Sequence, residues 1–173
     1  METDDITDNP AIRAIFLFCV SLLLWVLLTG SLADAELVAG VMVAAAVSLL
    51  AWNSTGILSG VRLTPSAAVA LFRYLGYFSV ALVRANLDMA RRVLSPSVPL
   101  NPSLVEVRTG LRSDLGKLLL ANSITLTPGT LSVDVSGDRI LVHWIDCPAG
   151  TDLEAATAAI AAGFERHIGG FLK

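Results

Sequence analysis

The sequence predicts an α-helical membrane hairpin and an amphipathic third helix, followed by a small soluble α+β domain with the element order βαββα. Three observations lead to this fold class: two uncharged apolar runs, a long apolar segment whose charges share one helical face, and alternating strand patterns after residue 102. The composition agrees, because 54% of the 173 residues are hydrophobic and only 16% are charged, against about 25% charged in soluble domains.

The hairpin is predicted within residues 1–62, with spans at about 14–33 and 37–58. Neither span contains a charged residue, and about 20 helical residues cross a hydrocarbon core of about 30 Å. A short acidic loop with Asp34 and Glu36 separates the two runs. We therefore expect two spans joined by a tight turn.

A cleavable signal peptide is the alternative interpretation of the first apolar run. Ala33 and Ala35 flank Asp34 in a pattern that resembles a cleavage site. However, the residues before the run are acidic, among them Glu2 and Asp8, whereas signal peptides begin with a basic region. The acidic start favours a retained anchor.

Residues 63–94 form the amphipathic third helix, which is either interfacial or a third span. It is apolar overall, yet a helical wheel at 100° per residue places five polar side chains within about 60° of one another. Such a stripe suits the membrane interface or a face packed on a partner protein. A spanning orientation would bury at least one arginine, at about 2.5–3.5 kcal/mol. The five residues are Arg73, Tyr77, Arg84, Asp88 and Arg91.

The basic residues also predict the topology. A two-span hairpin places Arg13 and Arg62 on the same side as the third helix and leaves only acidic residues on the other side. Because basic residues favour the cytoplasmic side, we expect a multi-pass membrane protein with both termini and the C-terminal domain in the cytoplasm. Three spans remain the alternative.

Residues 95–102 contain three prolines and are predicted to be a linker before the domain at 103–173. The domain begins with an alternating strand at 104–109. Ser113 is then expected to cap a short helix that buries Leu115, Leu118 and Leu119. A loop over 121–130 follows, in which Pro128 and Gly129 form a type II turn.

A β-hairpin and a final helix complete the predicted domain. Two runs, 131–136 and 140–145, alternate apolar and polar residues around Ser136-Gly137-Asp138. The last helix is expected to begin at Thr151, with Glu154 completing a capping box. Gly169 and Gly170 are expected to end it.

The sequence offers no catalytic, cofactor-binding or metal-binding constellation. His143 has no second ligand at a metal-binding spacing, and the two cysteines, Cys19 and Cys147, lie far apart. The hydroxyls around Thr125 and Thr127 lack a nucleophile motif and are interpreted as caps of backbone groups. A net charge of −3 gives no electrostatic footprint for nucleic acid.

Two segments resemble the MrpE/MnhE family, the E subunits of the Mrp-type multisubunit Na⁺/H⁺ antiporters of bacteria. The first runs from Leu119 through Asn122 and the Thr-Pro-Gly turn to Thr130, continuing into 131–135 and 141–145. The second is Arg84-Ala-Asn-Leu-Asp-Met-Ala-Arg-Arg-Val-Leu-Ser-Pro96, which includes Asn86. The resemblance covers nearly the whole chain and is strongest from about 72 to 146.

The resemblance implies a small accessory subunit of a Na⁺/H⁺ antiporter, needed for assembly or stability, without its own ion pathway. The implied partners are the large and small membrane subunits of that assembly and the lipid bilayer. It transfers no catalytic residue. The alternative is a membrane-tethered α+β domain with an enzymatic or ligand-binding role. The motif residues are expected to shape a loop that contacts a partner or closes the soluble domain: Asn122, Thr125, Thr127, Pro128 and Gly129.

Overall fold

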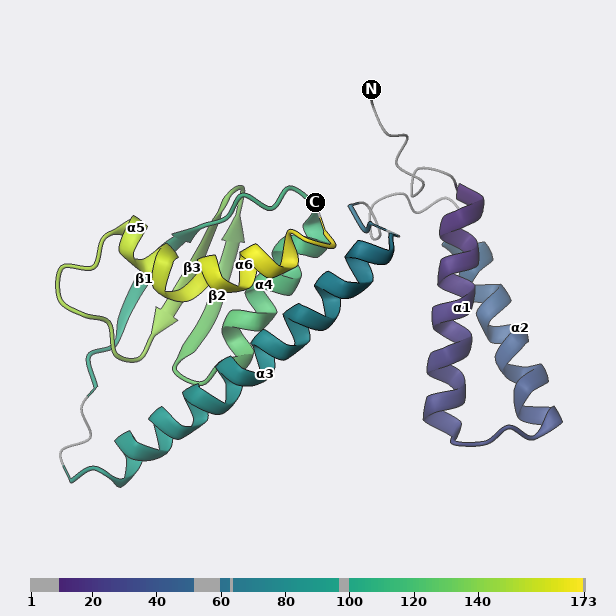
Figure 1. Cartoon of the computed structure of the whole chain (residues 1–173), viewed down its shortest axis with the longest axis horizontal. Helices are drawn as coiled ribbons and strands as arrows, with labels where there is room; N and C mark the ends of the chain where they lie inside the picture. The colour runs from purple at the N-terminus through teal and green to yellow at the C-terminus, as the bar shows by residue number, and fades with distance from the viewer. Residues whose placement is uncertain (1–9, 52–59, 63, 97–99, 173) are drawn as a thin grey trace. The chain divides into compact units, whose positions relative to one another are not determined.

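A computed structural model describes residues 10–51, 60–62, 64–96 and 100–172. They form two compact units, with the boundary in the sequence between Val61 and Arg62 (Figure 1). The first unit is helical, and the second combines helices with a sheet.

The first unit is a pair of helices, α1 (Pro10–Thr29) and α2 (Asp34–Leu50), packed along each other. The small residues Gly40, Ala44 and Ser48 recur every four positions and are the buried residues of α2. A Cβ atom added at Gly40 would lie 2.6 Å from Cδ1 of Trp25. Because small side chains let helix backbones approach closely in lipid, this stripe explains the tight pairing.

The hairpin boundaries differ from the prediction. Asp34 and Glu36 occupy the first turn of α2 instead of a loop, where their charges complement the helix dipole. The helix α1 begins at residue 10, ahead of the predicted span. Residues 52–58 of the second predicted span lie outside the described residues. In the described part of the chain, α1 and the later helix α3 (Pro65–Leu94) are long and apolar enough to cross a membrane.

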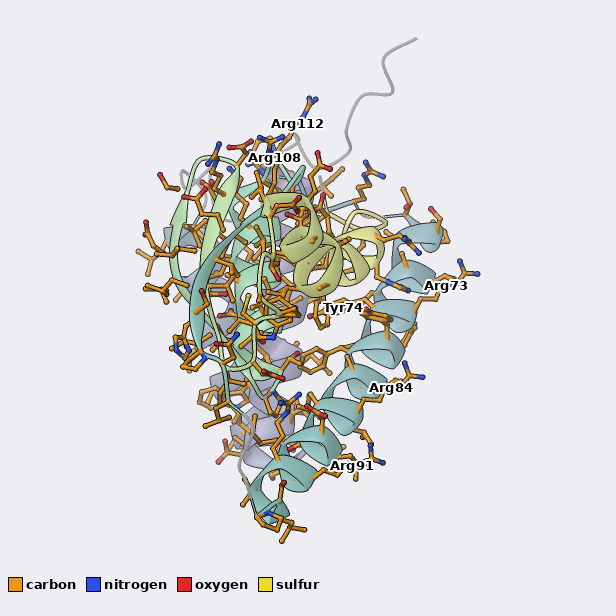
Figure 2. All side chains as sticks on the ribbon, turned by 90° about the vertical axis from the view of Figure 1, so that its left-hand side faces the viewer. Arg73, Tyr74, Arg84, Arg91, Arg108 and Arg112 are labelled. Atoms are coloured by element: carbon orange, nitrogen blue, oxygen red, sulfur yellow. The ribbon has the colours of Figure 1, made fainter. Side chains whose placement is uncertain are left out.

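The second unit contains a three-stranded antiparallel sheet with the strand order β1-β3-β2. Figure 2 shows the strands, the C-terminal helix and α3 as successive layers. The last helix is divided by a π-helical turn rather than continuous as predicted. The elements are β1 (Ser103–Arg108), α4 (Asp114–Leu126), β2 (Thr130–Ser136), β3 (Arg139–Trp144), α5 (Leu153–Ala156), the turn Thr157–Ala161 and α6 (Ala162–Ile168).

One face of the sheet forms the core with the helices. Ile140 and Val142 of the central strand are fully buried, as are Leu120 and Ile124 of α4. Full burial of each such side chain contributes about 1.5–3 kcal/mol. The opposite face stays open, and Leu131 of β2 is 49% exposed.

The helix α3 is part of this unit. Ala67 and Tyr74 are its buried residues, and the compact unit begins at Arg62. Gly163 of α6 and Gly170, which follows that helix, allow the close approach: a Cβ added at Gly170 would lie 2.6 Å from Cβ of Ala70, and one at Gly163 would overlap the Tyr77 hydroxyl.

Several local predictions for the domain were wrong. The helix capped by Ser113 continues to Leu126 and includes most of the predicted loop. It buries Leu120 and Ile124, whereas Leu118 is 57% exposed. Of the three leucines predicted to be buried, Leu115 and Leu119 are half-buried and Leu118 is exposed, because the buried stripe of the longer helix is centred on Leu120 and Ile124.

The final helix also begins one residue later than predicted. Asp152 is its N-cap, and its side chain accepts a hydrogen bond from the Ala155 amide at 2.8 Å. The Thr151 hydroxyl instead donates to the Pro148 carbonyl at 2.6 Å. Aspartate is at least as good an N-cap as threonine, so the adjacent residue replaces the predicted capping box.

Candidate functional site: the junction of α3 and the motif segment

The two segments that carry the family resemblance meet in space. The C-terminal half of α3 and the residues around the Thr-Pro-Gly turn enclose a cavity of about 230 Å³. We call this contact the α3 junction. Its lining includes Asp88, Met89 and Arg92 from α3, Thr127, Pro128, Gly129 and Thr130 from the turn, and Trp144, Ile145 and Asp146 at the end of β3.

Gly129 reverses the backbone at the junction. Its φ of +99° lies in the region that favours glycine. An added Cβ would lie 3.3 Å from Cγ2 of Ile145 and 3.5 Å from Cε of Met89. The Gly129 carbonyl accepts a hydrogen bond from the Ile145 amide at 2.9 Å. The turn therefore requires glycine for its conformation and leaves little space for a side chain.

The hydroxyls of the motif bind backbone groups. Thr127 donates to the Ser123 carbonyl at 2.8 Å, and Thr130 donates to the Ile124 carbonyl at 2.7 Å. The Thr125 hydroxyl accepts from the Ser132 amide at 3.1 Å. These bonds join the end of α4 to β2. The arrangement closes the domain and presents no activated nucleophile.

Arg92 connects α3 to the end of β3. Its Nε atom lies 2.7 Å from Oδ2 of Asp88, and its Nη1 atom lies 2.5 Å from Oδ2 of Asp146. Hydrogen bonds to these two carboxylates raise the pKa of Arg92 above its ordinary value. Neither Arg92 nor Asp146 was among the candidate residues predicted from the sequence. The four-residue spacing of Asp88 and Arg92 was the available signal.

Tyr74 provides a second, buried connection that the sequence analysis missed. Its hydroxyl lies 2.8 Å from the Ser123 hydroxyl. Ser123 also contacts the Leu119 carbonyl at 2.6 Å, where it can only donate. Because Ser123 has one hydroxyl proton, Tyr74 donates to Ser123. Nothing in the sequence connects positions 49 residues apart.

The predicted polar stripe on α3 divides into two faces. Tyr77 stacks on His167 at 4.5 Å between ring centroids, and Asp88 pairs with Arg92. Tyr77 therefore contacts the domain directly, whereas Asp88 pairs within α3 with Arg92, which in turn contacts Asp146 of the domain. Arg73, Arg84 and Arg91 instead point away from the domain and are exposed (Figure 2). We call them the arginine row.

The remaining candidate residues lie apart from the junction cavity. The Asn86 amide donates to the Leu82 carbonyl at 2.8 Å, within α3. Asn122 is exposed on α4, and His143 is half-buried in β3 beside Leu104 and Leu131 of the flanking strands. The described residues contain no group of three or more side chains suited to a metal ion. The geometry of the junction fixes α3 against the rest of the domain.

Comparisons with known proteins identify the family of this chain. A family model described as "Na⁺/H⁺ ion antiporter subunit" matches residues 18–170. The E subunit of the Na⁺/H⁺ antiporter of Alkalihalophilus pseudofirmus is 43% identical over 57% of this chain, and the match spans 62% of that relative's length. The E1 subunit of the Na⁺/H⁺ antiporter of Staphylococcus saprophyticus is 33% identical over 70% of this chain and 75% of its own.

A solved structure extends the similarity to the fold. A chain of the membrane-bound sulfane sulfur reductase, an archaeal respiratory membrane complex, matches with a TM-score of 0.76 and 39% identity over 91% of this chain and 97% of its own. The family match covers both the first apolar helix and the α3 junction. This chain is a membrane protein and belongs to the family of Na⁺/H⁺ ion antiporter subunits.

Proposed function

We propose that this chain is an accessory subunit of a monovalent cation/proton antiporter, needed for assembly or stability of the complex. The hairpin anchors it in the bacterial cell membrane beside the other subunits. The names of its relatives support this role, since both are E-type subunits of Na⁺/H⁺ antiporters. The family also occurs in an archaeal respiratory membrane complex, so the shared element is membership of a large membrane assembly.

The structure of α3 is the observation that carries the proposal. Contacts with the domain begin near Ala70 and extend to Arg92, over most of the 30-residue helix. A helix packed along a soluble domain is poorly placed to cross the bilayer. These contacts favour α3 lying outside the hydrocarbon core, which leaves α1 and α2 as the two spans, and the basic residues beside the hairpin favour a cytoplasmic domain.

The opposite side of α3 is the proposed docking face. It exposes large apolar side chains, including Phe72 at 72%, Val83 at 58% and Leu87 at 54%. The arginine row runs beside them, over about 27 Å from Arg73 to Arg91 at 1.5 Å per residue. An apolar strip with basic residues along its edge suits the boundary between lipid headgroups and a neighbouring subunit.

The hairpin gives no support for an ion pathway within this chain. Among the described residues, α1 carries Arg13 near its first turn, and α2 carries Asp34 and Glu36 in its first turn. The remaining residues of α1 and α2 contain no ionisable side chain except Cys19. Because proton and cation pathways use ionisable groups inside the membrane, the transport steps are assigned to other subunits.

The test compares two double variants of the full chain in its native membrane. Phe72→Gln with Val83→Gln alters the docking face of α3. Leu118→Gln with Leu126→Gln is the control, because these residues are 57% and 60% exposed on α4. Affinity purification in mild detergent and Na⁺-dependent proton movement in everted vesicles are the two readouts.

We expect the α3 variant to enter the membrane but to lose co-purifying subunits and antiport, while the control keeps both. Equal recovery and equal antiport in the two variants would exclude α3 as the docking face. The purified wild-type chain alone in liposomes should show no cation-coupled proton movement, and exchange by the chain alone would contradict the accessory role.

A further inference from the structure

A second cavity, of about 850 Å³, lies at the end of the domain where α3 begins. Three parts of the chain bring four arginines to its wall. Arg62 precedes α3, Arg108 ends β1, Arg112 lies in the following loop and Arg166 is on α6. Figure 2 shows Arg108 and Arg112 together at this end of the domain, away from the arginine row. One third of the 12 basic residues of the chain therefore line one cavity.

The acidic side chains in this region neutralise little of that charge. Glu165 is the acidic residue in the described lining, and its Oε1 atom accepts a hydrogen bond from the Gly110 amide at 2.8 Å. Arg108 lies 3.6 Å from Asp138 in a pair whose side chains are 58% and 65% exposed, so the pairing is weak. Arg62, Arg112 and Arg166 form no ion pair with any described residue.

The backbone around the cavity is held in place. The Arg62 amide donates to the Phe171 carbonyl at 3.0 Å, and the Arg108 amide donates to the Thr157 hydroxyl at 2.9 Å. Thr157 begins the π-helical turn that interrupts the last helix, and such turns occur frequently at functional sites. Leu111 and Leu172 supply a buried apolar base. The backbone amides of Arg62 and Arg108 are therefore hydrogen-bonded to other segments of the domain.

We propose that this cavity, the arginine pocket, binds a phosphate-bearing anion. Guanidinium groups match phosphate oxygens with paired hydrogen bonds, and four of them around one Glu suit a ligand with two or more negative charges. A single carboxylate would leave most of this charge unpaired. The volume lies within the range of small-molecule sites, about 300–1,000 Å³. A phospholipid headgroup and a soluble phosphate compound share the required chemistry.

The test uses the full chain purified in a nonionic detergent. Pyrophosphate is titrated by calorimetry as the soluble probe, and phosphatidylglycerol in mixed micelles is followed by native mass spectrometry as the lipid probe. The pocket variant is Arg108→Gln with Arg166→Gln, which are both exposed residues. Lys117→Gln with Arg139→Gln removes the same charge from the same unit, outside the pocket. Circular dichroism checks that both variants fold.

We expect the wild-type chain and the control to bind at least one probe equally. The pocket variant should bind at least about tenfold more weakly, as expected for loss of charge-assisted hydrogen bonds. Pyrophosphate binding would identify a soluble ligand, and lipid retention alone would identify a headgroup.

Equal binding by the pocket variant and the control would overturn the proposal, and so would a wild-type chain that binds neither probe. If the double variant fails to fold, Arg112→Gln alone applies the same test from an exposed loop position. This test measures binding by the chain itself, so its outcome is independent of assembly with other subunits.

Discussion

The helices α1 and α3 are both long and apolar, yet their surroundings differ. In α1 no residue is buried, and α1 is the more apolar of the two helices. α3 has one face on the domain, an exposed apolar face opposite and the arginine row between them. The arrangement of polar side chains around each helix, more than its length, therefore distinguishes a helix that packs on the domain from one that is apolar on all sides.

Removing α3 should have the largest effect. We expect a fragment covering 62–173 to unfold cooperatively, whereas a fragment covering 95–173 should lose that cooperativity. The shorter fragment exposes Phe164 and Phe171, which pack against Tyr77 and Tyr74. Thermal melting by circular dichroism, with a hydrophobic dye, measures the difference. Identical melting curves would show that the domain folds without α3.

Adding one methyl group at Gly163 tests the contact between α3 and the last helix. Gly163→Ala should destabilise the 62–173 fragment by about 1–3 kcal/mol, because the new methyl group overlaps the Tyr77 hydroxyl. Gly76→Ala is the matched control on α3, where an added Cβ meets nothing within 4 Å; it should stabilise by about 0.5–1 kcal/mol. Urea unfolding measures both, and changes of the same sign would argue against tight packing of α3.

The buried hydrogen bond of Tyr74 predicts an asymmetry between its two partners. Ser123→Ala leaves the Tyr74 hydroxyl without its acceptor and should cost about 1–3 kcal/mol, whereas Tyr74→Phe should cost about 0.5–1.5 kcal/mol. The double variant should be less destabilised than the sum of the two. Urea unfolding of the four proteins tests this, and an additive cycle would mean that the two hydroxyls are not coupled.

Gly129 and Gly137 separate backbone conformation from packing. Both have positive φ, +99° and +60°, so alanine at either position should cost about 1–2 kcal/mol. A Cβ at Gly129 also crowds Met89 and Ile145, whereas one at Gly137 meets nothing within 4 Å. Gly129→Ala should therefore be the more destabilising, by less than about 1 kcal/mol. Equal unfolding midpoints would mean that crowding of Met89 and Ile145 adds nothing to the cost of Gly129→Ala.

Arg92→Gln should have the smallest effect on stability. Its ion pairs are partly exposed, so salt should screen them. Because the two carboxylates raise the pKa of Arg92, the stabilisation is present below the ordinary arginine pKa and is lost only at strongly alkaline pH. Melting temperatures at low and high salt measure the contribution. A difference between wild type and variant that persists in about 1 M salt would contradict a screened pair.

Much of the fold follows from local patterns in the sequence. The uncharged run that forms α1 and the alternation of β1 and β3 are local patterns that give the correct elements. Ser113 and Gly129 act as predicted, one capping α4 and the other reversing the chain at positive φ. These features depend on neighbouring residues only, which is why composition and spacing suffice.

The candidate site was only half predictable. Gly129 and Asp88 could be selected from the sequence, because one occurs in a recognisable turn and the other in a polar stripe. The contacts of Arg92 with Asp146 and of Tyr74 with Ser123 could not, because they join positions 54 and 49 residues apart. A helical wheel gives the angular position of a side chain, but it does not show which face of the helix packs on the domain and which face is exposed.

The sequence by itself therefore determined the apolar anchor, the strand order along the chain and the turn glycines, because each is fixed by local conformation and hydropathy. Three features depend on tertiary contacts: α3 belongs to the domain, its polar stripe divides into a side that contacts the domain and an exposed arginine row, and arginines from three parts of the chain line one cavity. These outcomes come from contacts between residues far apart in the chain, where burial and charge depend on which surfaces meet.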